Sequence, residues 1–315
     1  MYNFNGYPIT WLIYGKIHGD LYVDGGHGVD APPYKEFFTI PNGTKIVWAS
    51  VFIGIWGGNE YNSGWIEVFL NSSSFGRQEI KGVNDNSLNI FGSTHGCYLV
   101  AYNITSYLEL NKTIEISVET GGTIDGRIYG IVLVVVFEKP NTVIKFCIGA
   151  GNVGLHYLIQ GQTYDSFTFT FEDTYLQSDF ATATLYVSYL ATSLGEADYL
   201  YFNDNLLDSN AGDESSGAYF DLDSYNVSLY LDSSNHVEFQ RGAEGYIHPI
   251  LAILTASYKP GLGEDEDYIH YNSEEYSGNS EFNWLYIEIP AIVLITLLVF
   301  MFQYRRKKKM IQERA

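Results

Sequence analysis

Positive charge is scarce in this sequence of 315 residues. The chain contains 17 Lys and Arg against 37 Asp and Glu, so its formal net charge at pH 7 is −20. Such a charge repels phosphate backbones, and the only strongly basic cluster lies in residues 305–315. The sequence therefore predicts no nucleic-acid partner.

Cysteine is nearly absent, with Cys97 and Cys147 as the only two. They form no C-x-x-C pair that would indicate zinc. Outside the cell, a disulfide between them would close a loop of about fifty residues and stabilise the fold by roughly 4 kcal/mol. The competing interpretation is a buried thiol, because Cys97 lies in an apolar run and unpaired cysteines pack well in cores.

Motifs of catalysis and cofactor binding are also missing. The chain has no G-x-S-x-G nucleophile elbow, and its seven histidines show no H-x-x-x-H or H-E-x-x-H spacing. For His156 and His248 we expect structural hydrogen bonds rather than a catalytic role. We therefore assign no catalytic or cofactor-binding residue and expect a protein that is not an enzyme.

One glycine-rich segment matches a motif that is typical of cofactor-binding sites. Residues 149–154 match G-x-G-x-x-G after a strand-like segment, as in dinucleotide-binding proteins. That motif requires a helix whose amino end faces the pyrophosphate, yet residues 155–159 run directly into Gly161 and an alternating strand pattern. We interpret the segment as a turn between two β domains.

Aromatic residues and strand-like patterns are abundant instead. Aromatic residues make up 16% of the chain, and its 31 glycines suit many short strands joined by turns. Apolar and polar residues alternate over 114–119 and 167–171, which predicts strands with one buried face. Residues 131–137 are apolar throughout, which predicts a central strand covered on both faces.

Similar segments recur in the same order along the chain. The matching pairs are 49–53 with 183–187, 103–107 with 221–225, and 139–140 with 259–260. Strands at this spacing, separated by turn-forming residues, are typical of sandwiches. We therefore predict an all-β fold with two tandem homologous β-sandwich domains of jelly-roll type. Chance similarity between two β-rich halves is the alternative.

These repeats define the predicted domain organisation. We expect an N-terminal segment packed on the first domain, a first sandwich, a connector, a second sandwich, an acidic stalk, a transmembrane helix and a basic cytoplasmic tail. Their residues are 1–36, 37–141, 142–162, 163–260, 261–283, 284–304 and 305–315, respectively. The stalk contains no Lys or Arg, so its carboxylates repel one another and favour an extended chain.

A long apolar run lies near the carboxyl end. Residues 284–302 contain Glu288 as their only charge, and basic residues occupy 305–309. At about 1.5 Å per residue, a helix of this length spans roughly 28 Å of a hydrocarbon core about 30 Å thick. We therefore predict a single-pass membrane protein that contacts the lipid bilayer through residues 284–304. A buried core helix is the alternative.

The basic flank also predicts orientation. Basic residues beside a spanning helix stay in the cytoplasm, so the large amino-terminal part is expected to be extracellular. Export requires a signal peptide, and the residues that follow Met1 have neither a basic start nor an apolar stretch. We expect that residues preceding Met1 supply this signal.

Four segments stand out together, at residues 47–58, 125–137, 151–157 and 241–249. The first is Val47-Trp-Ala-Ser-Val-Phe-Ile-Gly-Ile-Trp-Gly-Gly. In composition and order they resemble an uncharacterised cell-surface family of methanogenic archaea, the domain of unknown function 3344 (DUF3344). The resemblance covers most of residues 10–258. It implies an exported, all-β protein, often membrane-anchored, with no assigned activity or catalytic residue.

Tryptophan residues form the first candidate binding site. Trp48, Trp56 and Trp65 lie close together in the sequence, and such a cluster is able to stack on sugar faces. A role in the core is favoured, because Trp48 and Trp56 share parity with apolar neighbours along the predicted strand.

Other candidates involve calcium and covalent modification. Acid-rich loops make calcium the only candidate cofactor, through Asp204, Asp221 and Asp223. Sequons of the N-x-S/T type predict N-glycosylation at Asn42, Asn71, Asn103, Asn111 and Asn226.

Arginine is rare in the predicted extracellular part. Arg127 and Arg241 are therefore expected to pin carboxylate or carbonyl groups, with a contact to a sugar carboxylate as the minor alternative. The whole pattern predicts a membrane-anchored surface protein with a structural, adhesive or binding role in the cell envelope. Its expected partners are cell-wall polymers, glycans or other surface proteins. The alternative is a carbohydrate-binding or carbohydrate-active ectodomain that uses Trp-rich strand surfaces.

Overall fold

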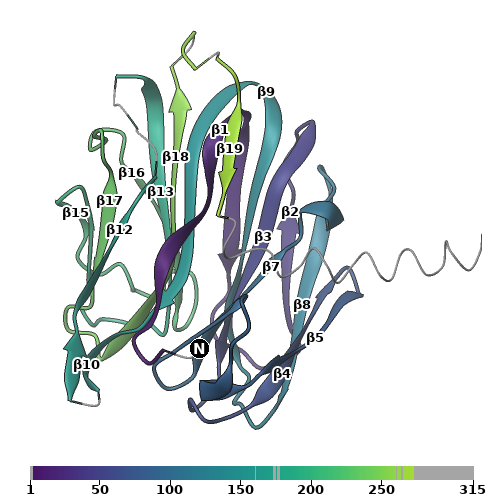
Figure 1. The fold of residues 1–315 in the computed structure, drawn as a ribbon, viewed down its shortest axis with the longest axis vertical. Helices are drawn as coiled ribbons and strands as arrows, with labels where there is room; N and C mark the ends of the chain where they lie inside the picture. Colours follow the sequence, from purple (N-terminus) through teal and green to yellow (C-terminus); the bar gives the residue numbers. More distant parts are fainter. Residues whose placement is uncertain are drawn as a thin grey trace, which may run out of the picture. The chain divides into compact units, whose positions relative to one another are not determined.

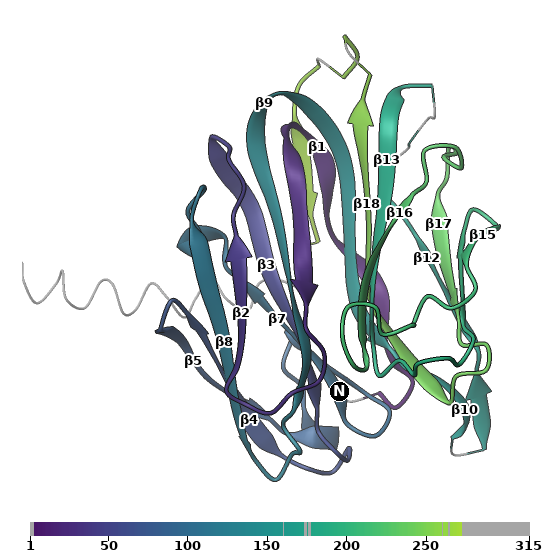
Figure 2. The ribbon, with the colours of Figure 1, turned by 180° about the vertical axis from the view of Figure 1, so that it is seen from behind.

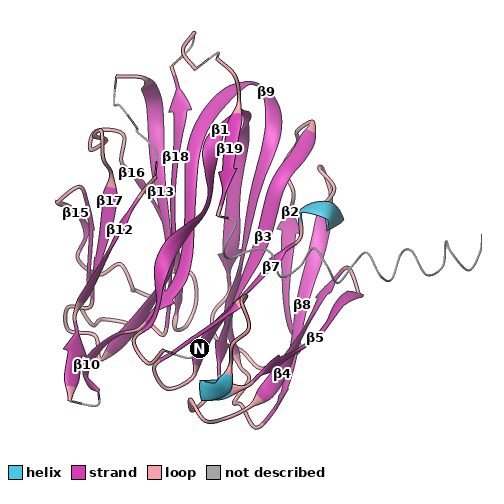
Figure 3. Ribbon diagram, in the orientation of Figure 1, coloured by secondary structure: helices cyan, strands magenta, loops and turns pink. Residues whose placement is uncertain are grey.

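The computed structural model describes residues 3–159, 161–172, 175, 178–259, 261–263 and 265–272. These residues belong to one compact unit, Met1–Asn272. Within this described part the chain is built from strands, with two 3-10 helices, η1 (Gly82–Asn84) and η2 (Thr105–Tyr107), as its helical elements (Figure 3). The predicted all-β class is confirmed.

The largest sheet contains eleven antiparallel strands. Its main path runs β11-β10-β18-β9-β3-β7-β6. Outside this path, β1 pairs with β9 and β19, and β13 pairs with β18 and β16. The strands are β1 (Gly6–Gly26), β3 (Lys45–Trp56), β6 (Ile90–Ser93), β7 (Cys97–Asn103), β9 (Ile128–Val153), β10 (Leu155–Ile159), β11 (Gln162–Tyr164), β13 (Phe180–Leu190), β16 (Phe220–Asn226), β18 (Tyr246–Tyr258) and β19 (Tyr268–Tyr271).

Two four-stranded sheets flank the large sheet on opposite sides (Figures 1 and 2). The first, in the order β2-β8-β4-β5, consists of β2 (Tyr34–Thr39), β8 (Thr113–Gly122), β4 (Gly64–Leu70) and β5 (Ser73–Ile80). The second, in the order β12-β17-β14-β15, consists of β12 (Ser166–Thr170), β17 (His236–Gln240), β14 (Tyr199–Phe202) and β15 (Asn205–Asp208).

Strands β1 and β9 run through both sides of this arrangement. β9 pairs with β3 up to Glu138 and with β18 from Ile144 onward, and Figure 1 shows it arching over between these two parts. β1 pairs with β9 along both parts, with a register shift at His18 and Gly19. We call residues 27–138 the first half and residues 143–259 the second half. The N-terminal segment, which was predicted to pack on the first domain, thus pairs through β1 with the parts of β9 that belong to both halves.

Each half has its own hydrophobic core. In the first half Ile114, Ile116 and Val118 of β8 face the odd-numbered residues of 131–137, which belong to the same buried cluster. A second cluster joins β12, β13, β17 and β18 in the second half. These cores follow from the alternation that predicted the strands, because every second side chain points to the same face.

The opposite face of the first half packs against the second half. Val132, Val134 and Val136 are completely buried although they point away from the first core, so the prediction of a doubly covered strand at 131–137 is confirmed. Two glycines permit the contact. A Cβ atom on Gly54 would lie 2.6 Å from Leu190, and one on Gly130 would lie 2.8 Å from the ring of Phe220.

The two halves share one hydrogen-bonding motif. The Thr105 hydroxyl bonds to the backbone of Ala49, and the Ser228 hydroxyl bonds to that of Ala183 in the same way. The backbone amides of Thr105 and Ser228 in turn donate to the Oδ1 atoms of Asn103 and Asn226. This agrees with the match of 49–53 to 183–187. The counterpart of Asn103 is Asn226, however, so the predicted match of Asn103 with Asp221 is wrong.

The glycine-rich segment is a strand and not the turn that we predicted. Gly149, Ala150, Gly151, Asn152 and Val153 all lie within β9, so residues 142–162 contain core strands where a connector was expected. A Cβ atom on Gly149 would lie 2.6 Å from the Phe169 ring, and one on Gly151 would lie 2.5 Å from a backbone oxygen. The glycines allow close packing between strands.

The start of the predicted stalk also folds onto the sheet. β19 pairs with β1 from Ile13 to Lys16. The ammonium group of Lys16, almost completely buried, donates to the backbone oxygen of Asp265 at 2.7 Å and pairs with its carboxylate. His18 contacts the Asp267 carboxylate at 2.8 Å. Lys16 and His18 of β1 thus bind carboxylates that were expected to repel one another in an extended stalk.

The remaining predictions concern the carboxyl end. Within the described residues, no helix has the length and apolar character needed to cross a membrane. The predicted transmembrane segment 284–304, the tail 305–315 and the stalk residues from 273 onward lie outside the described residues.

Candidate functional site

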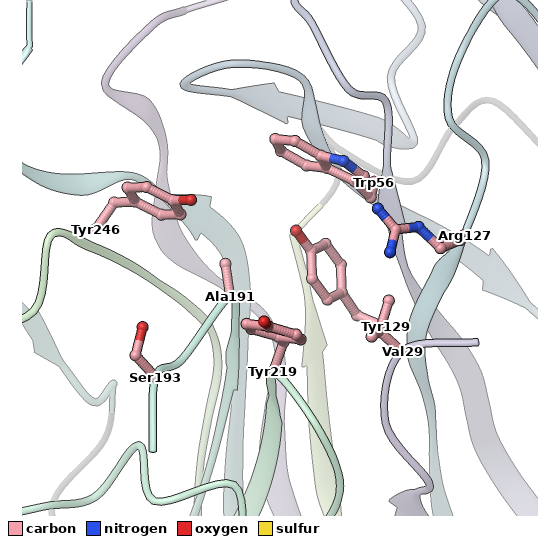
Figure 4. Close-up of a pocket in the computed structure, with 8 residues that line it drawn as sticks. All are labelled: Val29, Trp56, Arg127, Tyr129, Ala191, Ser193, Tyr219 and Tyr246. Atoms are coloured by element: carbon pink, nitrogen blue, oxygen red, sulfur yellow. The ribbon is translucent and has the colours of Figure 1, made fainter. Parts of the chain in front are cut away.

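A pocket of about 220 Å³ opens at the edge of the contact between the two halves. Strand ends place its residues there: Trp56 ends β3, Tyr129 lies near the start of β9, and Tyr246 begins β18. Figure 4 shows Trp56, Arg127 and Tyr129 on one side and Tyr246 on the other. The lining residues are Val29, Trp56, Arg127, Tyr129, Ala191, Ser193, Tyr219 and Tyr246.

The first-half wall is fixed by backbone hydrogen bonds. The Trp56 amide donates to the oxygen of Arg127 at 2.8 Å, and the Gly126 amide donates to the oxygen of Trp56 at 2.7 Å. The rings of Trp56 and Tyr129 meet edge to face, with centroids 6.4 Å apart. Burial raises the pKa of Tyr129, so its phenol stays neutral at physiological pH. The wall therefore presents two rings in fixed positions.

Arg127 forms the charged part of this wall. Its Nε atom lies 2.6 Å from Oδ1 of Asp125, and its Nη2 atom lies 3.3 Å from Oδ2. This bidentate bond raises the pKa of Arg127 further. Arg241 donates to one oxygen of Asp165, Oδ1, through Nε at 3.1 Å and Nη2 at 2.5 Å. Both arginines thus pin carboxylates, as predicted.

The second-half wall contains two residues in an unusual backbone conformation. Ala191 and Tyr219 both have φ near +59°, a region that costs energy for residues other than glycine. The Ala191 amide donates to the oxygen of Tyr219 at 2.9 Å, which joins the two segments. The side chains of Tyr219 and Tyr246 are 49% and 45% exposed, so both rings are available to a ligand.

Buried and half-buried carboxyl groups support the loops behind this wall. We call Asp198, Asp221 and Glu244, which are buried, and Asp223, which is half-buried, the carboxyl frame. Glu244 accepts a hydrogen bond from the Ser193 amide at 2.8 Å. Asp198 accepts the amides of residues 211 and 212, and Asp221 accepts those of residues 214 and 215. The frame therefore fixes the backbone that carries Ser193 and leads to Tyr219.

Burial dominates the acidity of the carboxyl frame. It raises the pKa of Asp198 and Asp221 to about 6, although backbone donors oppose the change. It raises the pKa of Asp223 to about 7 and that of Glu244 to about 8. Glu244 is completely buried, so its carboxyl group is mainly protonated at neutral pH.

The three tryptophans of the candidate sugar site lie in different environments in the structure. Trp48 is buried in the core, and Trp65 lies on β4 with the Arg77 guanidinium 3.6 Å from its ring centroid. Trp56 lines the pocket. Trp48 and Trp56 lie on the face of β3 that packs against the second half, as their shared parity predicted. The pocket at the edge of this face was not predicted.

The two cysteines are free, buried thiols in the structure, which agrees with the second of the two interpretations and not with a disulfide between them. Cys147 points into the second core, whereas Cys97 lies on β7 beside the end of β3. Burial raises the pKa of the Cys97 thiol, which makes it unreactive.

Both histidines form hydrogen bonds with polar side chains, as expected. The Nδ1 atom of His248 lies 2.9 Å from the Ser93 hydroxyl and 3.0 Å from Oδ1 of Asn152, and Nε2 of His156 lies 3.0 Å from Oδ1 of Asn5. Burial lowers the pKa of His248 to about 3, so its ring stays neutral. The His248 cluster joins the hairpin of β6 and β7 to β9 and β18.

The calcium candidates do not come together as one site. Asp221 and Asp223 belong to the carboxyl frame, whereas Asp204 is a highly exposed residue 3.4 Å from the His236 ring. In the part of the chain that the structure describes, no group of three or more Asp, Glu, His or Cys residues has the geometry of a metal site.

The sequons occupy turns and strand ends. Asn42 and Asn111 hydrogen-bond to each other at 3.1 Å, and Asn71 accepts the Glu115 amide at 2.9 Å. Asn103 and Asn226 belong to the motif shared by the two halves. Glycosylation of the sequons stays a prediction.

The other residues that line the pocket were not predicted from the sequence. Tyr129, Ser193, Tyr219 and Tyr246 lie far apart along the chain and carry no motif. A usable signal is their position beside strand ends, because antiparallel neighbours bring such ends to one edge of a sheet.

Comparison with solved structures finds loose similarity. PNGase F, a glycosylasparaginase from Flavobacterium meningosepticum, has a TM-score of 0.27 and 12% identity and covers 80% of this chain and 99% of its own. The conserved protein of unknown function PA5104 from Pseudomonas aeruginosa has a TM-score of 0.30 and 8% identity over 80% and 100%. The ANX2 ectodomain from Arabidopsis thaliana has a TM-score of 0.28 and 7% identity over 80% and 89%. Similarity this loose assigns no function.

Sequence comparison gives a clearer result. No curated protein has significant similarity to the chain. Residues 2–257, however, match the family described as "Protein of unknown function (DUF3344)". This match covers most of the chain and agrees with the segments that carried the resemblance. The protein therefore belongs to the DUF3344 family.

Proposed function

We propose that this protein is a carbohydrate-binding surface module and that the aromatic pocket holds one sugar ring. The observation that carries the proposal is the meeting of four aromatic rings, Trp56, Tyr129, Tyr219 and Tyr246, with a guanidinium group in one cavity. Its volume of about 220 Å³ suits a ligand the size of a single ring.

The chemistry of the lining suits a sugar. Aromatic faces pack against the apolar C–H faces of sugar rings, and tyrosine hydroxyl groups are able to donate and accept hydrogen bonds. Arg127 and Ser193 add further polar groups around the cavity. The eight lining residues include no Asp or Glu, whereas sugar hydrolysis generally needs two carboxyl groups across the scissile bond. The site therefore favours binding over cleavage.

The proposed cellular setting rests on the sequence. The apolar run 284–304 would anchor the protein, and the basic tail would keep the carboxyl end in the cytoplasm. The two halves, proposed as homologous sandwiches, would then face cell-wall polymers, glycans or other surface proteins. Protease added to intact cells should degrade the large domain, and protection until lysis would contradict this orientation.

A glycan array with the purified full-length chain in detergent tests the binding proposal. Trp56→Ala should weaken binding to any positive glycan about tenfold or more, because the loss of one stacked ring costs on the order of 1.4 kcal/mol. Trp65→Ala is the matched control, since Trp65 contacts Arg77 and lies outside the pocket. Equal weakening by both substitutions, or no binding to any glycan, would contradict the proposal.

A further inference from the structure

The charge of the pocket depends on one ion pair. Arg127 is the only ionised residue among the eight that line the cavity. Asp125, in the same turn, binds two of its nitrogens through both carboxylate oxygens. The backbone of this turn is itself held, because the Asp125 amide donates to the oxygen of Gly57 at 3.1 Å. The two opposite charges therefore stay together and nearly cancel.

An anionic ligand is poorly matched to this arrangement. Nε and Nη2 of Arg127 are engaged by Asp125, so only one edge of the guanidinium remains for a ligand. A carboxylate or sulfate bound there would approach the Asp125 carboxylate. It would also approach a chain with a net charge of −20. No Lys lines the cavity to offset this repulsion.

A cationic ligand is also poorly matched. A cage of aromatic rings often binds ammonium groups through cation–π attraction. In this pocket, however, Trp56 shares its wall with Arg127, as Figure 4 shows. An ammonium group among the rings would face the guanidinium, while the carboxylate of Asp125 is already engaged by it. The repulsion opposes the attraction of the rings.

An uncharged hydroxylated ring satisfies both constraints. The remaining edge of Arg127 is able to donate to a hydroxyl or carbonyl oxygen, and Tyr129, Ser193, Tyr219 and Tyr246 carry hydroxyl groups of their own. We infer that the pocket selects neutral sugars and that the Asp125–Arg127 pair causes it to reject acidic, sulfated and amino sugars. This inference rests on the proposed carbohydrate-binding function.

The test uses a glycan array that presents the same backbones in neutral, sulfated and amino-bearing forms. We expect the full-length chain to bind a neutral form at least tenfold more tightly than its charged counterparts, with little dependence on salt. Tighter binding of a sulfated or amino-bearing form would overturn the inference and leave the proposed function intact. Binding to no glycan would overturn both.

Two variants of the protein test the role of the ion pair. Both are assayed with the glycan backbone that binds in the array, in its neutral, sulfated and amino-bearing forms. Asp125→Asn should uncover Arg127 and strengthen binding of the sulfated form about tenfold, in a salt-dependent manner. Arg127→Met should leave Asp125 uncompensated and strengthen binding of the amino-bearing form instead. Opposite shifts support the inference, whereas unchanged selectivity in a folded variant overturns it. If one variant fails to fold, the other carries the test.

The matched control removes an equivalent charge elsewhere. Glu115→Gln breaks an exposed ion pair with Lys35, which spans 2.8 Å between β2 and β8, outside the lining of the pocket. This variant should keep the selectivity of the unmodified chain. A change in selectivity equal to that of Asp125→Asn would indicate a general effect of net charge and would overturn the inference.

Discussion

Raising the pH from 7 to 9 should destabilise this protein through Glu244. Burial raises the pKa of Glu244 from 4.5 to about 8, so the folded state binds its proton more tightly than the unfolded state does. The resulting stabilisation is complete below the unfolded pKa and decreases as the pH rises toward and through the folded pKa. Ionisation then leaves a charge in a completely buried site.

The size of the effect follows from proton linkage. For a folded pKa near 8, the free energy of unfolding should fall by about 1.4 kcal/mol between pH 7 and pH 9. Asp198, Asp221 and Asp223 contribute mostly below this range, because their folded pKa values are about 6 to 7. His248, whose pKa is lowered to about 3, contributes with the opposite sign and only below about pH 6.5.

Glu244→Gln isolates the contribution of this carboxyl group. Glutamine keeps an oxygen for the Ser193 amide, and its nitrogen replaces Oε2, which has no hydrogen-bond partner in the described part of the chain. Urea unfolding followed by tryptophan fluorescence should show a shallower decline in stability between pH 7 and pH 9 for the variant. Equal declines for both proteins, or a steeper decline for the variant, would refute the reasoning.

Three further predictions address packing and the cysteines. Gly130→Val should destabilise the fold by about 1–3 kcal/mol in urea unfolding, because its side chain would meet Phe220, and wild-type stability would argue against the contact between halves. Asn152→Ala should cost about 1–3 kcal/mol by removing the side-chain amide that donates to the buried backbone oxygens of Phe91 and Cys97, and an unchanged midpoint would contradict this role. Reducing agent should leave the melting temperature unchanged, since Cys97 and Cys147 form no disulfide, and a decrease would contradict the structure.

Local periodicity was sufficient to find the buried strands. Successive side chains of a strand point to opposite faces, so the alternation over 114–119 indicates one buried face and the unbroken apolar run over 131–137 indicates two. Gly149 and Gly151 show the limit of this logic. Their role is to admit Phe169 and the backbone of β1, and these neighbours are distant in the sequence.

Long-range pairing explains the other differences. The acidic segment after Gly263 looks self-repelling until Lys16 and His18 of β1 are placed beside it. Trp56 was recognised as a candidate sugar contact, but its partners Tyr219 and Tyr246 come from the other half. Spacing along the chain carries no information about which strand ends meet at one edge.

The most direct test of the sugar-binding account is NMR observation of the indole N–H groups of the five tryptophans during titration with a neutral oligosaccharide. Trp56→Phe would assign the signal of Trp56. The account predicts that this signal shifts in a saturable way while those of Trp48 and Trp65 stay in place. A saturable shift at Trp65 without one at Trp56, or no shift with any glycan, would contradict it.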